Sequence, residues 1–263
     1  MKITALIENT SNKNDITTEH GLSLYIQTQK HKILFDMGQS NIFCDNAEKL
    51  NIKLEDIDIA ILSHGHYDHG GGLKKFLEIN TTAPVYIHEK SFNKHYSGKD
   101  KYIGLDMSIK NSDRIIFTNK NIKIDDELEI LNCNNSIAKY PLSNENMNLL
   151  TENGMITDSF EHEQYLIITE NCKKTVISGC SHKGIQNISD WLKPDCIVGG
   201  FHLKNTEMNS EGKEKLSEIA LNLFEKNITY YTCHCTGIEQ YDFMKTIMKD
   251  KLFYLHCGDT FKI

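Results

Sequence analysis

The strongest constraint on the fold is a short segment in which four potential metal ligands follow an apolar run. The run IDIAILS ends at residue 63 and is followed at once by HGHYDHGGG. Side chains alternate along a strand, so His64 and His66 project to the same side and can bind one metal ion together. Asp68 and His69 are adjacent, and after a turn they can serve a second ion. The glycines that follow permit close backbone approach. The segment therefore predicts a loop that supplies half the ligands of a two-metal site.

Short runs rich in β-branched and aromatic residues alternate with segments of helical periodicity. This order predicts an α/β protein with two sheets packed face to face and helices outside. No Pro/Gly/Ser-rich linker interrupts it, so a single domain over residues 1–263 is expected. The polar segment 92–114 has no regular pattern, and we expect it to shape the substrate pocket. The predicted strands are 23–27, 32–36, 57–63, 85–88, 122–124, 128–131, 165–169, 175–178, 196–199, 228–232 and 252–263, and the predicted helices are 42–51, 184–192, 209–226 and 237–249.

Charge and hydropathy exclude several classes of partner. The net charge is −7, and no run of Lys and Arg is long enough to suggest a nucleic-acid groove or an anionic membrane surface. No stretch approaches the roughly 18 to 20 apolar residues of a membrane span. We therefore expect a cytoplasmic protein with a small, anionic substrate, no nucleic-acid partner and no membrane partner. The eight cysteines are expected to be thiols in that reducing compartment.

Three further motifs lie downstream of the histidine segment. They are GCSH at 179–182, GGFHL at 199–203 and HCTG at 234–237, each after a strand-like run. Together with HGHYDH, they resemble the metallo-β-lactamase superfamily. Within it, the chain is similar to the branch of 7,8-dihydropterin-6-methyl-4-(β-D-ribofuranosyl)aminobenzene-5′-phosphate synthase-like proteins. The resemblance extends along almost the whole chain and implies an αββα sandwich.

The resemblance also implies a ligand set for two divalent ions, for which zinc is expected and iron or manganese are the alternatives. Asp36, in ILFDMG, matches an upstream aspartate that orients the ligands from behind, although a plain turn aspartate would look the same. The implied ligands are His64, His66 and His182 for the first ion, and Asp68, His69 and His234 for the second.

Two positions leave this ligand set open. Cys180 stands where related hydrolases place a bridging aspartate, so it either binds metal as a thiolate, which favours zinc, or packs behind His182. His162 is the rival of His182 as third ligand of the first ion. His202 lies outside the set and is expected to bind substrate or transfer a proton, with structural packing as the alternative.

The remaining cysteines and histidines near these motifs have no comparable context. Cys233 and Cys235 flank His234 and would point the other way on an extended segment, so we expect packing thiols. The histidines to which the sequence assigns no role are His20, His31, His88, His95 and His256.

These features predict a metal-dependent hydrolase that activates water against a small phosphorylated or ester-type metabolite, with Asp68 also holding the attacking water. The similarity to the synthase branch implies that the reaction could instead resemble that of the synthases. A non-catalytic metal sensor and a redox di-iron protein are the alternatives, and His66 argues against the second because such proteins carry Glu there. Ser181, Lys183 and Lys204 lie beside motif residues and could contact an anionic substrate, as could the first turn of the helix that follows GCSHKG.

Overall fold

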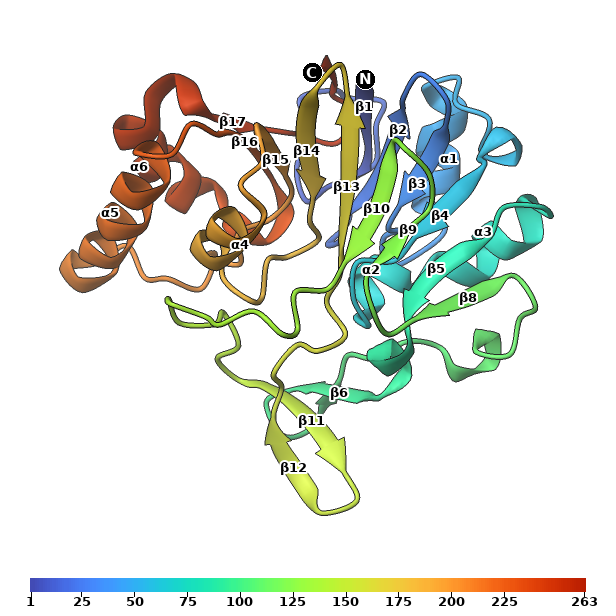
Figure 1. The fold of residues 1–263 in the computed structure, drawn as a ribbon, viewed down its shortest axis with the longest axis horizontal. Coiled ribbons are helices and arrows are strands. Elements are labelled where there is room, and N and C mark those ends of the chain that lie inside the picture. The colour runs from blue at the N-terminus through green and yellow to red at the C-terminus, as the bar shows by residue number, and fades with distance from the viewer.

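The computed structural model describes all 263 residues. The chain forms two seven-stranded sheets that pack face to face, with helices on both outer faces (Figure 1). The first sheet is built mostly from the N-terminal half of the chain and has the order β18-β1-β2-β3-β4-β5-β8. Its strands are β18 (Thr260–Lys262), β1 (Lys2–Ile7), β2 (Ser23–Gln27), β3 (Lys32–Phe35), β4 (Ile59–Ile61), β5 (Val85–His88) and β8 (Ile115–Thr118).

The second sheet is built from the C-terminal half and has the order β17-β16-β15-β14-β13-β10-β9. The four strands β14 to β17 run parallel, so their carboxyl ends meet at one edge. Its strands are β17 (Leu252–Tyr254), β16 (Thr229–Thr232), β15 (Cys196–Val198), β14 (Lys173–Ile177), β13 (Tyr165–Glu170), β10 (Leu128–Leu131) and β9 (Ile122–Lys123).

Three apolar clusters hold these layers together. One lies between the sheets, and the other two lie between a sheet and its helices. Strand β3 shows how the sequence builds them, since Ile33 and Phe35 enter the inter-sheet cluster while Leu34 faces the helices. The expected αββα sandwich is therefore confirmed. The covering helices are α1 (Ile42–Lys49) and α3 (Leu73–Ile79) on the first sheet, and α4 (Ile185–Leu192), α5 (Ser210–Phe224) and α6 (Ile238–Met248) on the second.

A third, four-stranded sheet projects from the sandwich (Figure 1). Its order is β12-β11-β6-β7, with β12 (Gly154–Thr157), β11 (Met147–Thr151), β6 (Lys94–Ser97) and β7 (Lys101–Tyr102). The sequence does not predict this sheet, because its strands are short and several of their residues are exposed on both faces. Short 3-10 helices cover Leu54–Asp56, Glu89–Phe92, Met107–Ile109, His234–Thr236 and Lys249–Lys251.

The two ends of the chain differ most from the expected strand pattern. Residues 252–263 form two strands instead of one, with β17 in the second sheet and β18 beside β1 in the first. The sequence pattern does not predict β1, although five of its six residues are buried. The predicted strand at 57–63 is shorter and spans Ile59–Ile61. No helix in the structure combines the length and the apolar character of a membrane span.

Candidate metal centre

The predicted ligands converge where strands of both sheets end. His64 and His66 lie in the loop after β4, and the short helix α2 (Tyr67–Gly70) carries Asp68 and His69. His182 and His234 lie in the loops after β14 and β16 of the second sheet. The two sheet edges face each other, so residues far apart in sequence meet in one buried cluster.

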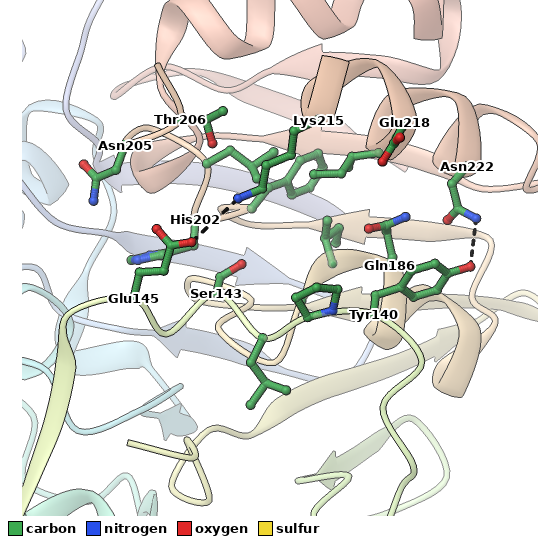
Figure 2. Close-up of a pocket in the computed structure, with 17 residues that line it drawn as sticks. Tyr140, Ser143, Glu145, Gln186, His202, Asn205, Thr206, Lys215, Glu218 and Asn222 are labelled. Carbon is green, nitrogen blue, oxygen red and sulfur yellow. Dashed lines mark hydrogen bonds and ion pairs between the residues drawn. The ribbon is translucent and has the colours of Figure 1, made fainter. Parts of the chain in front are cut away.

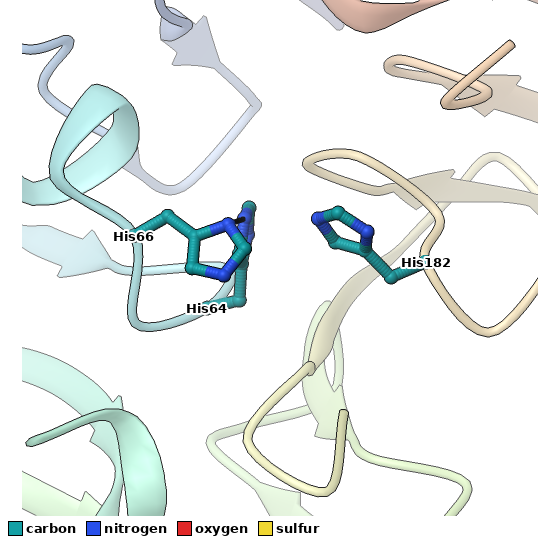
Figure 3. A group of neighbouring side chains, drawn as sticks. All are labelled: His64, His66 and His182. Atoms are coloured by element: carbon teal, nitrogen blue, oxygen red, sulfur yellow. Dashed lines mark hydrogen bonds between the residues drawn. The ribbon is translucent and has the colours of Figure 1, made fainter. Parts of the chain in front are cut away.

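The first half of this cluster is a group of three imidazoles (Figure 3). Possible ligand atoms of His64, His66 and His182 all lie within 4.8 Å of one another. The ring centroid of His182 is 5.0 Å from that of His64 and 5.2 Å from that of His66. The Nε2 atoms of His66 and His182 are buried and have no hydrogen-bond partner. Two lone-pair donors therefore remain unsatisfied in this group.

The second half is centred on the carboxylate of Asp68. Its Oδ2 lies 3.4 Å from Nε2 of His234 and 3.9 Å from Nε2 of His69. The rings of His69 and His64 are 4.2 Å apart, which joins the two halves. His20 also reaches Asp68, with Nε2 3.2 Å from Oδ2. The sequence assigns His20 no role and no pattern marks this residue, so this contact is one that sequence reasoning missed.

Asp36 lies behind the cluster, as the sequence indicates. Its Oδ2 accepts hydrogen bonds from Nδ1 of His69 at 2.7 Å and from Oγ of Ser63 at 2.7 Å. Because the Ser63 hydroxyl donates to Asp36, its oxygen accepts from Nδ1 of His64 at 2.8 Å. Both histidines therefore carry a proton on Nδ1, so Nε2 is the atom by which each would bind a cation. Nε2 of His64 lies 3.1 Å from Nδ1 of His66, and Nε2 of His69 lies 3.2 Å from Sγ of Cys180.

Burial and neighbouring charges set the protonation of the cluster. Burial, together with the other imidazoles, holds the pKa values of His64, His66 and His182 well below the usual range. Burial would also lower the pKa of His69, but the carboxylates of Asp36 and Asp68 raise it to about 9. Burial opposes ionisation of Asp68, yet the adjacent histidines hold its pKa well below the usual range. The site thus combines the neutral imidazoles of His64, His66 and His182 with the buried carboxylate of Asp68. A divalent cation suits this set, and binding at His69 would displace the second proton of that ring.

The chain matches a known family over most of its length. The family model of the metallo-β-lactamase superfamily matches residues 16–182. The chain belongs to the metallo-β-lactamase superfamily. Two proteins of Methanocaldococcus jannaschii are each 29% identical to it. One, an uncharacterised protein, aligns with 97% of this chain and 98% of its own length. The other, a 7,8-dihydropterin-6-methyl-4-(β-D-ribofuranosyl)-aminobenzene-5′-phosphate synthase, aligns with 100% of this chain and 96% of its own length.

Solved structures of the superfamily share the fold. Tm1679, described as a metal-dependent hydrolase of the β-lactamase superfamily, superposes with a TM-score of 0.83 at 28% identity, covering 100% of this chain and 99% of its own. The Zn²⁺-bound PqqB of Methylobacterium extorquens superposes with a TM-score of 0.63 over the full length of both chains. At 11% identity, PqqB supports the sandwich architecture alone.

Two cysteines, Cys180 and Cys235, lie beside the histidines of the candidate metal centre. Sγ of Cys180 is 3.2 Å from Nε2 of His69, and burial raises the pKa of its thiol. Sγ of Cys235 accepts a hydrogen bond from the backbone N–H of His202 and lies within 4.8 Å of Cys180 and His234 ligand atoms. The extended segment expected around His234 is wrong, because residues 234–236 form a 3-10 turn, and this turn brings Cys235 beside Cys180 and His234. Cys233 does pack in the inter-sheet cluster.

His162 lies beside the first group but has both nitrogens engaged. Its Nδ1 accepts from the backbone N–H of Gly65 at 2.9 Å, and its Nε2 donates to Asp158 at 3.2 Å. The same carboxylate accepts from Nδ1 of His95 at 2.7 Å, a contact that the sequence did not indicate. In this arrangement His162 supports the metal-site loop, whereas His182 presents a free nitrogen to it.

The lysines near the motifs do not behave alike. Lys183 is buried, and its Nζ donates to the carbonyl of Asn132 at 2.6 Å and that of Glu163 at 3.2 Å. The expectation that Lys183 contacts substrate is therefore wrong, because its ammonium is buried and donates its hydrogen bonds to groups of the protein itself. Ser181 is likewise buried and pairs with Ser178. Lys204 is exposed, with Nζ 3.5 Å from Nε2 of His20.

The loop between His64 and His66 allows a direct test of the close packing at the site. A Cβ on Gly65 would lie 2.2 Å from the carbonyl oxygen of Ser91 and 2.7 Å from its Cα. We expect Gly65→Ala to destabilise the fold by about 1–3 kcal/mol, since backbone cannot yield as a side chain can. Thermal unfolding measures this loss. Gly104→Ala is the control, because there the obstructing atoms belong to the exposed side chain of Tyr102. Equal stability of both variants would contradict the expectation.

Proposed function

We propose that this protein is a metal-dependent hydrolase with a dinuclear centre. The observation that carries the proposal is a set of three buried imidazole nitrogens without a hydrogen-bond partner, Nε2 of His66, His182 and His234. Those of His66 and His182 belong to the three-imidazole group, and that of His234 lies 3.4 Å from the Asp68 carboxylate. Leaving buried polar atoms unpaired is unfavourable, and the two proposed cations would together satisfy all of them. The ligands proposed are His64, His66 and His182 for the first ion, and Asp68, His69 and His234, together with the thiolate of Cys180, for the second.

The donor set favours zinc, because imidazole nitrogens predominate and the thiols of Cys180 and Cys235 lie nearby. Iron or manganese would also accept these ligands. The similarity to Tm1679, described as a metal-dependent hydrolase, supports a hydrolytic role. Metal binding is general in the superfamily to which the chain belongs.

When bound, two such ions supply activated water and polarise the substrate's carbonyl or phosphoryl oxygen. The side chains around them have distinct tasks in the proposal. Asp68 orients the attacking water and can accept its proton, while His20 holds that carboxylate through the 3.2 Å contact. His202 lies with its ring 4.1 Å from that of His182 and is placed to donate a proton to the departing group.

The substrate proposed is a small phosphorylated or ester-type metabolite. The synthase relative carries a 5′-phosphate in the name of its product, and this chain is similar to it along its whole length. The test is turnover of bis(p-nitrophenyl) phosphate, a lactone and a thioester by purified protein, with metal content measured in parallel. We expect about two metal equivalents per chain and turnover of at least one probe, lost on chelation and regained with zinc. Metal-free protein with full activity would refute the proposal, and a metal-loaded protein without turnover would favour a sensor.

The similarity to a synthase supports a second candidate, in which an organic acceptor replaces water as the nucleophile. Mass spectrometry of the products separates the two reactions. Hydrolysis adds the elements of water to the substrate, whereas transfer joins the substrate fragment to an added acceptor.

His182 and His162 offer a matched pair of variants for the first ion. We expect His182→Ala to lower metal content from about two equivalents toward one, because a free nitrogen that faces the cluster is lost. His162→Ala removes only a side chain that supports the loop, so we expect it to lower metal affinity by about 10- to 100-fold. Both are measured by competition with a chelator. The assignment is reversed if His162→Ala loses an equivalent while His182→Ala keeps both.

A further inference from the structure

A cavity of about 510 Å³ opens beside the metal centre (Figure 2). Its walls are the loop 140–145, the first turn of α4, the loop 201–206 and one face of α5. The volume lies within the range of small-molecule sites. Residues 140–145 line it, and none of 92–114 does, so the expectation that the latter shape the pocket is not met for this cavity. His202 is the residue through which the cavity adjoins the metal centre, since its ring lies 4.1 Å from that of His182.

Unpaired polar atoms lie at both ends of this cavity. Near the metal centre, Nδ1 of His202 is buried without a partner. At the other end, Asn222 on α5 donates from Nδ2 to the hydroxyl of Tyr140 at 3.0 Å. Oδ1 of Asn222 is buried and has no partner, and Figure 2 shows the side chain facing the cavity. A buried amide oxygen without a donor is unfavourable, so this end is suited to a ligand N–H.

The lining is poorly suited to an anion. Its charged side chains are one lysine, Lys215, and two glutamates, Glu145 and Glu218. Nζ of Lys215 is 3.9 Å from Oε1 of Glu145, so its charge is already paired across the mouth. Apolar side chains such as Phe201 and Ile219 form much of the rest. A phosphate would meet a net negative lining here, whereas a flat uncharged group would find apolar surface and hydrogen-bonding amides.

We propose that this cavity binds the non-reacting part of the substrate as an uncharged planar ring that carries an N–H donor, such as a heterocyclic lactam. The proposal rests on the proposed function, in which the anionic or ester group lies at the metals. The ring packs on the apolar lining, and its N–H donates to Oδ1 of Asn222. Loop 140–145 and α5 are held together over it by the Tyr140–Asn222 and Glu145–Lys215 contacts.

The test compares two phosphodiesters that differ in the ring. Thymidine 5′-(p-nitrophenyl phosphate) carries a lactam ring, and methyl p-nitrophenyl phosphate has none. We expect zinc-loaded protein to prefer the thymidine diester by at least about tenfold in kcat/KM, the value of one buried hydrogen bond to a matched partner. Asn222→Leu should bring this preference toward one, and Asn227→Leu, at an exposed position outside the cavity, should retain it. Equal rates for both diesters with wild-type protein would overturn the proposal.

A binding measurement separates failure of the cavity from failure of the hydrolase. Calorimetry of thymidine and guanosine, which are uncharged, needs no turnover. We expect at least one to bind zinc-loaded wild-type protein and to bind Asn222→Leu about tenfold more weakly. If the diesters are not cleaved but this pattern holds, the proposed hydrolysis fails and the cavity stands. If neither nucleoside binds, or the Asn222 variant binds equally well, the cavity proposal is wrong.

Discussion

Replacing His66 with alanine is expected to remove the first metal ion and abolish turnover while the protein stays folded. His66 is 5% exposed, and its Nε2 has no partner in the protein. Loss of a direct ligand should reduce metal affinity by more than the roughly 10- to 100-fold typical of a supporting residue. The fold should persist, because three apolar clusters, and not the site, hold the layers together. Metal equivalents per chain and thermal unfolding of the metal-free protein give the two readouts.

His88→Ala is the matched control for this variant. His88 is also buried and has an unpaired Nε2, but it lies at the end of β5 and belongs to none of the ligand groups described above. We expect it to keep both metal equivalents. If His66→Ala retains two equivalents, His66 is not a ligand. If metal-free His66→Ala unfolds where metal-free wild-type does not, its role is structural.

The ligands that lie close together in the sequence could be predicted, because their spacing along one loop determines how their side chains are arranged. His64, His66, Asp68 and His69 come from one loop, and strand alternation followed by a turn places them without knowledge of the rest of the chain. Asp36 could be predicted for a similar reason, since it directly follows β3, the strand that pairs with β4. The sandwich was predictable because strands buried on both faces read as continuous apolar runs.

The remaining contacts depend on backbone turns that the sequence does not reveal. Cys235 reaches the cluster because a 3-10 turn replaces the extended segment expected there. His20 reaches Asp68 from a loop without regular structure. Lys183 is buried because Asn132 and Glu163, distant in sequence, supply carbonyl acceptors for its ammonium. Neither His20 nor Lys183 shares a motif with the residues that it contacts.

The network behind the metal loop connects the third sheet to the site. His95 lies on β6, and Asp158 directly follows β12. Burial opposes ionisation of Asp158, but hydrogen bonds from His162 and His95 hold its pKa below the usual range. Nδ1 of His162 in turn accepts a hydrogen bond from the backbone N–H of Gly65. The projecting sheet is thereby anchored to the loop that carries His64 and His66.

Cys180→Ser is expected to have the second large effect, by removing a thiolate ligand of the second ion. Sγ of Cys180 lies 3.2 Å from Nε2 of His69, close to the separation of about 3.5 Å that tetrahedral zinc imposes on a nitrogen and a sulfur ligand. Burial raises the pKa of this thiol in the metal-free protein, but a bound cation deprotonates a coordinating thiol. A neutral hydroxyl is a much weaker ligand, so metal content should fall from about two equivalents toward one.

Cobalt substitution tests this assignment without any need for turnover. A thiolate bound to Co²⁺ gives a near-ultraviolet charge-transfer band, which we expect in wild-type protein and in Cys235→Ser but not in Cys180→Ser. Cys235 is the matched control because it is equally buried, and the N–H of His202 already donates to its sulfur. Cys180→Asp should restore metal content in part, because a carboxylate is again available at this position. If Cys180→Ser keeps both ions and the band, Cys180 only packs behind His182, and the second ion depends on Asp68, His69 and His234 alone.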